Sequence, residues 1–281
     1  MTRFALCALV GALLASPAAR AAAPIEDAFP TADPGTLREP ARKVLERAFE
    51  NLYGCDLEQE IELTTRSAGS PVRNHKLRVL RKTIDGRAHV LVRFVTANDY
   101  WDMRVLKIEN RDRSDDHFIW VPSLRRIRRF TSVQQADQFQ GTDLTLQDLE
   151  VKRADRFEIV GRAFSVLRGE PVQVLTVEPL TDLGYRRSIM YVSQRDYATL
   201  EVHYYRDTGG NRPYKVARAP REDMLVMDGH VLPQRWIFTD YQHGTETEAR
   251  WRHLQVVTGL DDELFTAARL ETRNFLPEFG N

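Results

Sequence analysis

The sequence predicts a mainly antiparallel β fold with a helical lid (α+β), in which one strongly curved sheet forms an incomplete β-barrel. Three observations predict this fold class: apolar and polar residues alternate in many short segments, turn sequences recur between the segments, and strand–helix–strand alternation is missing. Short spacers produce hairpins, so the strands are expected to form an antiparallel meander rather than a Rossmann or TIM architecture.

The first 23 residues have the pattern of a secretory signal peptide. Arg3 precedes a short apolar run, and small residues then offer cleavage after Ala21 or after Ala23. A retained membrane anchor is the alternative, but an anchor needs about 20 apolar residues, and this run is shorter. The sequence therefore predicts an exported protein of the periplasm.

The remaining chain is divided into a flexible lead at residues 24–36 and a single domain at residues 37–281. Removal of residues 1–23 takes away two of the 40 basic residues and none of the 40 acidic ones, which leaves a formal charge near −2. A charge this close to zero gives no electrostatic case for a nucleic-acid partner. The share of hydrophobic residues, 42%, excludes a disordered chain.

A lid helix is expected at about residues 37–53. Thr36 and Glu39 have the spacing of a capping box, Pro40 falls in the first turn, and Gly54 is a natural stop. Apolar residues then recur every three or four positions and give the helix one apolar face. These residues are Ala41, Val44, Leu45, Ala48, Phe49 and Leu52.

The period of the pattern changes to two after Asp56, where a first strand begins at Leu57. Residues 132–150 lack strand propensity and predict a helical or loop insert. Further strands are expected on both sides of this insert, at about 72–82, 89–96, 103–109, 117–121, 125–130, 155–160, 171–179, 185–192, 199–205, 213–219, 222–227, 231–239 and 246–257.

Two helical segments are few for a sheet of this size, so the sheet is expected to curl and cover its own apolar face. A curled sheet can enclose apolar space that its side chains do not fill, although a filled core gives the same alternation. The side chains expected to line this space are Phe94, Trp120, Tyr191, Trp236 and Phe238.

Sequence motifs of catalysis and metal binding are missing. The chain lacks G-x-S-x-G, H-E-x-x-H, P-loop and G-x-G-x-x-G patterns, and its seven histidines are scattered. Asp115, Asp116 and His117 are interpreted as a polar hairpin tip rather than a metal site. Cys55 is expected to be a buried structural thiol. We therefore expect no enzyme activity, no metal and no cofactor.

Four arginines in five residues form the strongest local charge: Arg125, Arg126, Arg128 and Arg129. Their guanidinium groups suit phosphate head groups or an acidic partner surface. The alternative is that exposed charges on this strand discourage pairing with another sheet edge. Both interpretations stay open.

Two neighbouring motifs resemble the outer-membrane lipoprotein-sorting protein family, which are relatives of the periplasmic carriers LolA and LolB. The first, Phe118–Arg129, resembles the family pattern W-x-P-x-x-R-R-x-R, and the second, Phe139–Leu149, resembles G-(S/T)-D-(F/L)-(S/T)-x-x-D. The likeness extends over about residues 37–271. It implies a curved, incomplete barrel whose helix-covered cavity accepts acyl chains without catalysis. Within the second motif, Thr142 and Asp143 are interpreted as caps of the lid turn.

The resemblance and the residue patterns together predict a periplasmic carrier that moves a lipid or an acylated lipoprotein between the inner and outer membranes. Val44, Leu45, Phe49 and Leu52 are expected to form the movable lid face. The expected partners are the cargo, a transient membrane contact and an inner-membrane RND-type transporter, with the carrier itself a monomer. Two alternatives remain, a non-catalytic envelope docking or structural protein and an exported hydrolase with dispersed catalytic residues.

Overall fold

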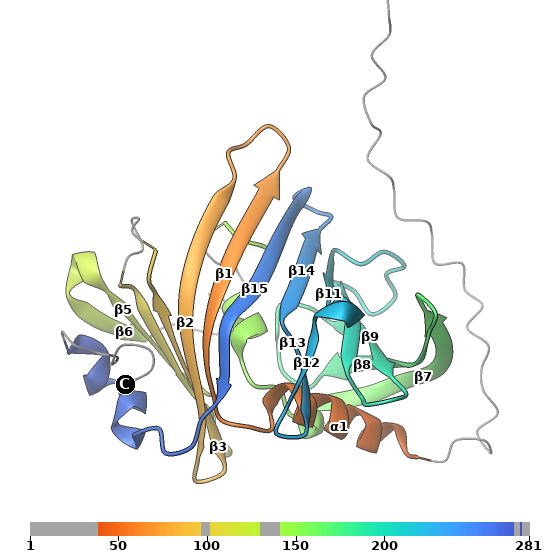
Figure 1. Cartoon of the computed structure of the whole chain (residues 1–281), viewed down its shortest axis with the longest axis horizontal. Coiled ribbons are helices and arrows are strands. Elements are labelled where there is room, and N and C mark those ends of the chain that lie inside the picture. Colours follow the sequence, from red (N-terminus) through yellow and green to blue (C-terminus); the bar gives the residue numbers. More distant parts are fainter. Residues whose placement is uncertain (1–38, 97–101, 130–140, 273–275, 277–281) are drawn as a thin grey trace, which may run out of the picture.

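One antiparallel sheet of thirteen strands forms most of the described structure (Figure 1). This computed structural model describes residues 39–96, 102–129, 141–272 and 276; the predicted signal peptide, the lead and residues 132–140 of the insert lie outside the described residues. The strands, in sheet order, are β6 (Arg126–Arg129), β5 (Asp116–Val121), β4 (Arg104–Ile108), β3 (Arg87–Phe94), β2 (Arg73–Ile84), β1 (Leu57–Ser67), β15 (Thr245–Val256), β14 (Arg235–Asp240), β11 (Lys215–Arg218), β10 (Thr199–Tyr205), β9 (Arg187–Ser193), β8 (Glu170–Pro179) and β7 (Phe157–Leu167).

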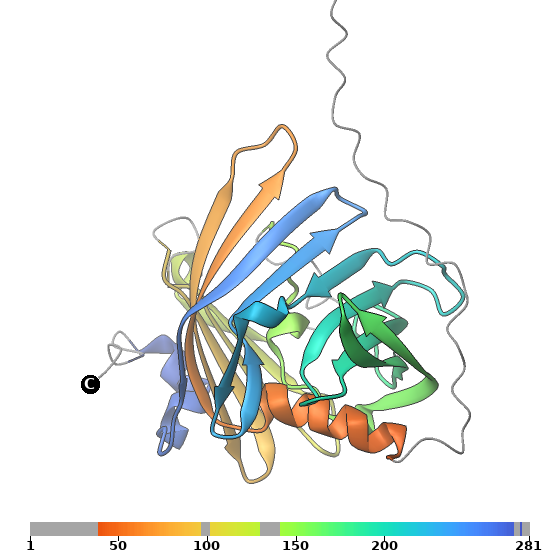
Figure 2. The same ribbon diagram turned by 45° about the vertical axis from the view of Figure 1, so that its right-hand side comes forward.

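The last strand of the sequence lies in the middle of the sheet. β15 pairs with β1 on one side and with β14 on the other, and so joins the two halves of the meander. Strands β6 and β7 form the two edges of the described sheet. The sheet is therefore strongly curved but open, as the sequence predicts for an incomplete barrel (Figures 1 and 2).

The strand prediction is confirmed in outline and is wrong in two details. β7 continues to Leu167 instead of ending near residue 160, because a register shift between Ile159 and Gly161 allows the ladder with β8 to resume. The predicted strand 231–239 is two strands, β13 (His230–Pro233) and β14. β13 leaves the main sheet and pairs only with β12 (Met224–Met227) in a separate hairpin.

The predicted lid helix is α1 (Ala41–Tyr53), which starts later than expected. Pro40 is the N-cap residue, and Glu39 lies before the helix, so the capping box expected from Thr36 and Glu39 does not form its first turn. At the other end the helix stops where predicted, with the Gly54 amide donating to the Glu50 carbonyl oxygen at 2.8 Å. Figure 2 shows α1 lying across the lower end of the curved sheet, next to the β12–β13 hairpin.

The insert is an inner segment with little regular helix. Its described part, residues 141–156, carries two short 3-10 turns, Leu146–Leu149 and Ala154–Arg156, and lies inside the curve of the sheet (Figure 1). Thr145 caps the first turn in a capping box with Asp148. Thr142 and Asp143 precede this box and do not cap the 3-10 turn, although the Thr142 hydroxyl accepts a hydrogen bond from the Leu144 amide at 3.3 Å.

Asp143 instead anchors the inner segment to β15. Its buried carboxylate accepts hydrogen bonds from the hydroxyl groups of Thr245 and Thr247, the latter at 2.8 Å. Its backbone amide also donates to the Thr247 hydroxyl at 2.9 Å. On the other side, the hydroxyl groups of Thr65 and Thr247 lie 2.8 Å apart, so this small network joins the insert, β15 and β1.

Apolar side chains form three buried clusters, which lie on both faces of the sheet. The largest fills the concave side and includes α1, the inner segment and strands from both halves. The second lies on the outer face of β2 to β6, where alternate residues such as Leu80, Leu91 and Leu106 pack under two C-terminal 3-10 turns, Asp262–Phe265 and Ala268–Glu271. The third joins β7 to β10 to the β12–β13 hairpin.

We predict that Thr247→Val destabilises the fold, because the buried Asp143 carboxylate and amide would both lose a hydrogen-bond partner. Leaving buried polar groups unpaired costs about 1–3 kcal/mol. Thermal or chemical unfolding of the variant measures this cost. Thr83→Val provides the control, since Thr83 lies on β2 with an exposed side chain. Equal stability of the two variants would contradict the assigned network.

Candidate functional site

An apolar cavity of about 130 Å³ lies between α1, the inner segment and the concave face of the sheet. Most of its wall is hydrophobic or aromatic, as is typical of small-molecule sites in proteins. Residues from α1, β1, β9, β10, β14 and β15 contribute to it. The apolar part of the lining is Phe49, Leu52, Tyr53, Leu57, Ile61, Leu144, Leu149, Phe157, Tyr185, Met190, Val202, Tyr204, Ala217, Leu232, Pro233, Trp236, Phe238, Ala249, Trp251 and Leu254.

Two β-bulges bring additional side chains to this wall. In β15 the register moves from Ile61↔Trp251 to Glu60↔His253, which leaves Arg252 as the extra residue. Trp251 and Leu254 are three positions apart and would face opposite sides of a regular strand, but the bulge turns both toward the cavity. A second bulge at Leu200 likewise lets Thr199 and Val202 line it together.

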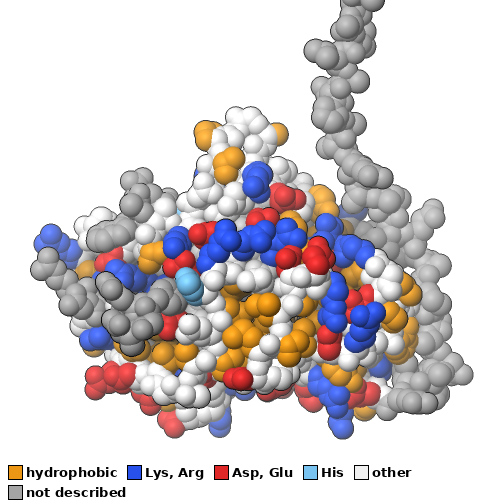
Figure 3. All heavy atoms as spheres, in the orientation of Figure 1, with side chains coloured by type: hydrophobic (Ala, Val, Ile, Leu, Met, Phe, Trp, Pro, Cys, Tyr) orange, Lys and Arg blue, Asp and Glu red, His pale blue; other side chains and the backbone are white. Residues whose placement is uncertain are grey.

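The mouth of the cavity lies where β15 extends beyond the start of β14. Figure 3 shows hydrophobic side chains gathered on this part of the surface, below a band of Lys and Arg mixed with acidic groups. The central strands carry ion pairs such as Lys76–Glu60 at 2.5 Å and Arg252–Glu62 at 2.6 Å. Apolar surface is therefore accessible at the mouth and is bordered by paired charges.

Helix α1 closes one side of the cavity through an aromatic contact and a few hydrogen bonds. The rings of Phe49 and Phe157 lie 5.5 Å apart, and Leu52 lines the cavity one turn further on. Asn51 connects α1 to the hairpin, because its side-chain oxygen accepts from the Val231 amide at 3.1 Å. The ring of His230 contacts the Glu50 carbonyl oxygen at 2.9 Å.

Three charged side chains also line the apolar cavity, namely Arg81, Asp148 and Lys152. Asp148 forms a buried ion pair with Lys215 at 2.7 Å. Burial would raise the pKa of the Asp148 carboxyl, but the adjacent Lys215 and Lys152 hold it below its ordinary value. Arg81 donates to the Cys55 carbonyl oxygen at 3.1 Å and lies over the Tyr53 ring. Lys152 donates to the Gln147 carbonyl oxygen at 2.7 Å.

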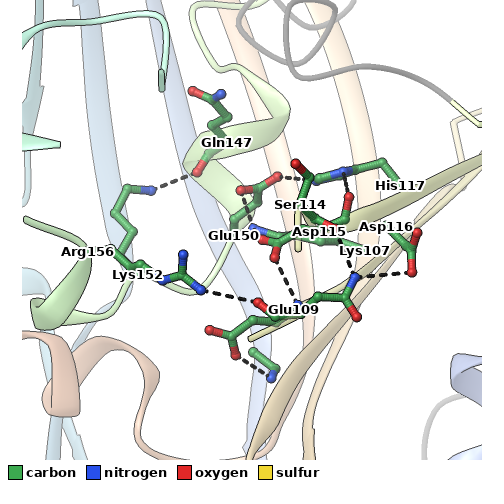
Figure 4. A network of polar contacts seen from close by, with 12 residues as sticks. Lys107, Glu109, Ser114, Asp115, Asp116, His117, Gln147, Glu150, Lys152 and Arg156 are labelled. Carbon is green, nitrogen blue, oxygen red and sulfur yellow. Dashed lines mark hydrogen bonds and ion pairs between the residues drawn. The ribbon is translucent and has the colours of Figure 1, made fainter. Parts of the chain in front are cut away.

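A second cavity, of about 460 Å³, adjoins the first and is lined mainly by charged groups. Lys152 and Phe157 line both cavities and thus form a shared wall. Figure 4 shows the polar network of this region, in which side chains of β4 and β5 reach those of the inner segment. The remaining lining comprises Lys107, Glu109, Arg113, Ser114, Asp115, His117, Gln147, Glu150, Val151, Arg153, Arg156, Thr181, Asp182 and Leu183.

Glu150 is the centre of this network. Its carboxylate binds Lys107 at 2.5 Å and His117 at 3.1 Å, and Lys107 also binds Asp115 at 3.0 Å. Burial would raise the pKa of Glu150, but the neighbouring Lys107 and His117 lower it to about 2. The carboxylate is therefore charged at neutral pH and holds the inner segment against β4 and β5.

The predicted lid and lining residues are distributed over three environments. Phe49, Leu52, Trp236 and Phe238 line the apolar cavity. Val44, Leu45 and Phe94 are buried in the same concave cluster without reaching the cavity wall.

Trp120 and Tyr191 lie on the other face of the sheet, which corrects their expected place on the lining. On β5, His117 and Ile119 face inward, so Trp120 points outward and packs with the second cluster. Tyr191 belongs to the third cluster and lies 5.1 Å from the His203 ring. The expectation failed because both faces of these strands are covered, and alternation alone does not distinguish a covered outer face from the core.

The arginine segment forms β6, an edge strand of the sheet. Arg125, Arg126 and Arg128 are exposed. Arg126 and Arg128 lie in the short hairpin of β5 and β6, and Arg125 lies in its turn. Arg129 binds Asp116 and lies over the Phe118 ring at 5.3 Å. The edge position fits the interpretation that these charges discourage further strand pairing. Among the ion pairs between described residues, none involves Arg125, Arg126 or Arg128, so their exposed guanidinium groups also suit a partner of opposite charge.

The hairpin tip at residues 115–117 is neutralised by cations rather than open to a metal. Asp116 binds Arg113 and Arg129, and Asp115 binds Lys107. Across the described ranges no group of three or more His, Cys, Asp or Glu side chains could hold a metal ion. Cys55 is half-buried rather than fully buried as predicted, and its partial burial raises the pKa of the thiol.

Sequence analysis missed Lys107, Glu150, Lys152 and Lys215 as members of the site. Charged residues in a strand or loop usually face solvent, and nothing in the local sequence distinguishes these four. One signal was available for the bulge in β15: Trp251 and Leu254 are out of phase with a period of two.

Comparisons with known proteins place this geometry in a known fold. A family model described as "Uncharacterized protein" matches residues 86–272, and no curated protein matches the chain. A domain from Vibrio parahaemolyticus named for outer membrane lipoprotein sorting has a TM-score of 0.72 and 20% identity, covering 82% of this chain and 98% of its own. A DUF1329 family protein from Desulfovibrio piger gives 0.72 and 20%, with coverage of 82% and 97%.

A LolA superfamily protein from Nitrosomonas europaea is also similar, with a TM-score of 0.66 and 17% identity over 81% of this chain and 98% of its own. The chain therefore has the fold of the LolA superfamily, which confirms the resemblance inferred from its motifs. Within the described residues, no helix has both the length and the apolar character needed to cross a membrane.

We predict that Glu150→Gln lowers the free energy of unfolding at pH 7 by about 3 kcal/mol, near the lower end of the range for removing one partner of a buried ion pair. The lower end applies because Asp115 still binds Lys107. Denaturant unfolding measures the loss. Glu46→Gln, on the exposed face of α1, is the matched control and should have little effect.

The same variant should have a flatter stability profile in acid. A folded pKa of about 2 lies below the ordinary value of 4.5, so Glu150 stabilises the protein above pH 4.5 and this contribution disappears as the pH falls toward 2. Asp116 and Glu201, whose pKa values are also about 2, keep part of the acid dependence in the variant. An unchanged profile between pH 5 and 2 would contradict the assigned ion pair.

Proposed function

The chain belongs to the family whose model matches residues 86–272, and we propose that it is a periplasmic, non-enzymatic carrier that binds a lipid or lipid-modified cargo in its apolar cavity. The observation that carries this proposal is the cavity itself, which is lined by aromatic and aliphatic side chains and is accessible through an apolar mouth. The names of two similar structures, one for lipoprotein sorting and one for the LolA superfamily, support it.

Burial of the acyl chain supplies the binding free energy. Each methylene group removed from water contributes about 0.8 kcal/mol, so a long chain contributes roughly 10 kcal/mol before ordering costs. The cavity volume of about 130 Å³ is similar to the engineered cavity of about 150 Å³ that binds benzene. A whole acyl chain therefore requires the wall to move apart.

Helix α1 is the element proposed to move. Phe49 and Leu52 form its cavity face, with Val44 and Leu45 packed beside them in the core. The packing of α1 on the empty cavity competes with the cargo for the same apolar surface. A lid that packs well on the empty cavity therefore favours release of the cargo. Trp236 and Phe238 form the opposite wall on the sheet side.

The exposed arginines of β6 are proposed to contact an anionic membrane surface or an acidic partner during transfer between the inner and outer membranes. An inner-membrane RND-type transporter is one such partner, and the carrier acts as a monomer. The same arginines also suit a docking or structural protein, the second candidate function.

The described residues give little support to a hydrolase. The apolar cavity wall includes Ser188 and Asp148 but no histidine. In the charged cavity, the two ring nitrogens of His117 contact Glu150 and the Asp115 carbonyl oxygen, at 3.1 and 3.2 Å. A base that activates a hydroxyl would need one of these nitrogens.

We predict that Ala249→Leu weakens binding of a long-chain fluorescent fatty acid by about tenfold or more, because the larger side chain occupies the cavity. Ala249 is fully buried and lines the cavity. Ala163→Leu is the matched control, since Ala163 belongs to the third cluster and overpacks a different region. Thermal unfolding identifies any variant that fails to fold, and equal affinity of both folded variants would sink the cavity assignment.

We predict that tying α1 to the β12–β13 hairpin slows cargo uptake and release. Glu50→Cys and His230→Cys, in a Cys55→Ser background, place two thiols where the helix and hairpin are in contact. A short thiol-specific crosslinker then fixes the helix. Transfer of the fluorescent fatty acid between vesicles is measured before and after crosslinking, with the unlinked variant as control. Full transfer by the crosslinked protein would refute the gating role of α1.

A further inference from the structure

The wall shared by the two cavities contains a cation with no acidic partner of its own. Lys152 lines both the apolar and the charged cavity, and its ammonium group donates to the Gln147 carbonyl oxygen at 2.7 Å. The two nearest acids are already bound by other cations, Asp148 by Lys215 and Glu150 by Lys107. Among the ion pairs formed by the described residues, none includes Lys152.

A second cation of the charged cavity, Arg156, also has no acidic partner among the described residues. Arg156 donates to the Asn110 carbonyl oxygen at 3.2 Å, and no ion pair within the described ranges involves it. The other cations of this lining are paired, for example Arg153 with Glu109 at 2.6 Å. The remaining acid, Asp182, is exposed and accepts a hydrogen bond from the Gly184 amide at 2.9 Å.

A partly buried ammonium group with only a carbonyl partner is costly, because burial removes part of its hydration. Accordingly, burial lowers the pKa of Lys152, although Asp148 and Glu150 partly oppose this change. A negatively charged group brought into the charged cavity would pair with Lys152 and remove part of this cost. At Lys152 the charged cavity adjoins the apolar cavity, and Phe157 lines both.

Building on the proposed carrier function, we propose that the preferred ligand is an amphiphile with an anionic head group, a carboxylate or a phosphate. Its head lies in the charged cavity against Lys152 and Arg156, and its alkyl chain passes Phe157 into the apolar cavity. Arg81, the other cation of the apolar wall, is less suited because it does not line the charged cavity, and two of its nitrogens, Nε and Nη2, bind the Cys55 carbonyl oxygen at 3.3 and 3.1 Å.

The geometry also explains why two cavities of different character adjoin. A neutral alkyl chain would gain only from the apolar cavity, whereas an anionic amphiphile gains from both. Charge-assisted hydrogen bonds are stronger than neutral ones, and their effect is large where water is excluded. Selectivity for the anion therefore depends on Lys152 rather than on the exposed arginines of β6.

The test compares ligands with the same chain and different heads. Binding of dodecanoate, dodecyl phosphate and dodecanol to the full mature chain is measured by titration calorimetry at pH 7.5. We expect both anions to bind at least tenfold more tightly than dodecanol. The stronger of the two anions identifies carboxylate or phosphate as the natural head group.

Variants then show which side chains cause the preference for an anionic head group. Lys152→Met keeps the length of the side chain and removes its charge, so it should bind the anions about tenfold more weakly and dodecanol within twofold of the wild type. Arg156→Gln should shift affinities in the same direction and serves if Lys152→Met does not fold. Lys43→Met, on the exposed face of α1, should change nothing.

The outcomes separate the head-group site from the carrier function. Equal binding of anions and dodecanol by the wild type would overturn the head-group site and leave the carrier function standing. The head-group site also fails if the folded Lys152→Met and Arg156→Gln variants both keep the wild-type preference. Binding of none of the three ligands would overturn both proposals.

Discussion

The pairing of β15 with both β1 and β14 is the interaction on which the rest of the structure depends. β1 to β6 pair with their neighbours in sequence, and so do β7 to β11. β14 is added to β11 after the separate β12–β13 hairpin, and β15 joins the two halves. Its ladder with β1 runs from Leu57↔Val256 to Ser67↔Thr245 and connects the two ends of the folded chain. Bringing such distant segments together costs loop-closure entropy before the contacts form. A long ladder offsets that cost, and its bulge at Arg252 gives the cavity two of its side chains.

The sequence was sufficient to predict features that depend on local pattern. Strand positions, the stop of α1 at Gly54 and the open curved sheet follow from periodicity, turn chemistry and the shortage of helices. It was insufficient where the outcome depends on what covers a face. Trp120 and Tyr191 alternate as core residues do, but the C-terminal turns and the hairpin cover them from outside. The place of Lys152 between the two cavities depends on contacts between residues far apart in the chain, which no local pattern contains.

The outer face of the sheet is covered by apolar side chains over some strands and by charged side chains over others. Where β2 to β4 are buried on both faces, their strands are held by packing from two sides and resist bending. Around β14 and the lower end of β15 the outer face carries charged pairs instead, and the inner face borders the mouth. The part of the sheet that borders the mouth therefore has charged side chains behind it instead of an apolar cluster.

The inner segment and α1 close the same cavity with different kinds of contact. Glu150 binds Lys107 on β4, and Asp148 binds Lys215 on β11, so buried ion pairs fix the inner segment to both halves of the sheet. Separating such a pair leaves an uncompensated charge and costs about 3–5 kcal/mol. By contrast, α1 is held by apolar packing and a few hydrogen bonds, and a lipid chain that entered the cavity would replace the apolar part of those contacts. In the proposed carrier, α1 is therefore the element that a hydrophobic ligand would displace, at the cost of hydrogen bonds such as those of Arg42 and Asn51, while the inner segment keeps its charged groups in place.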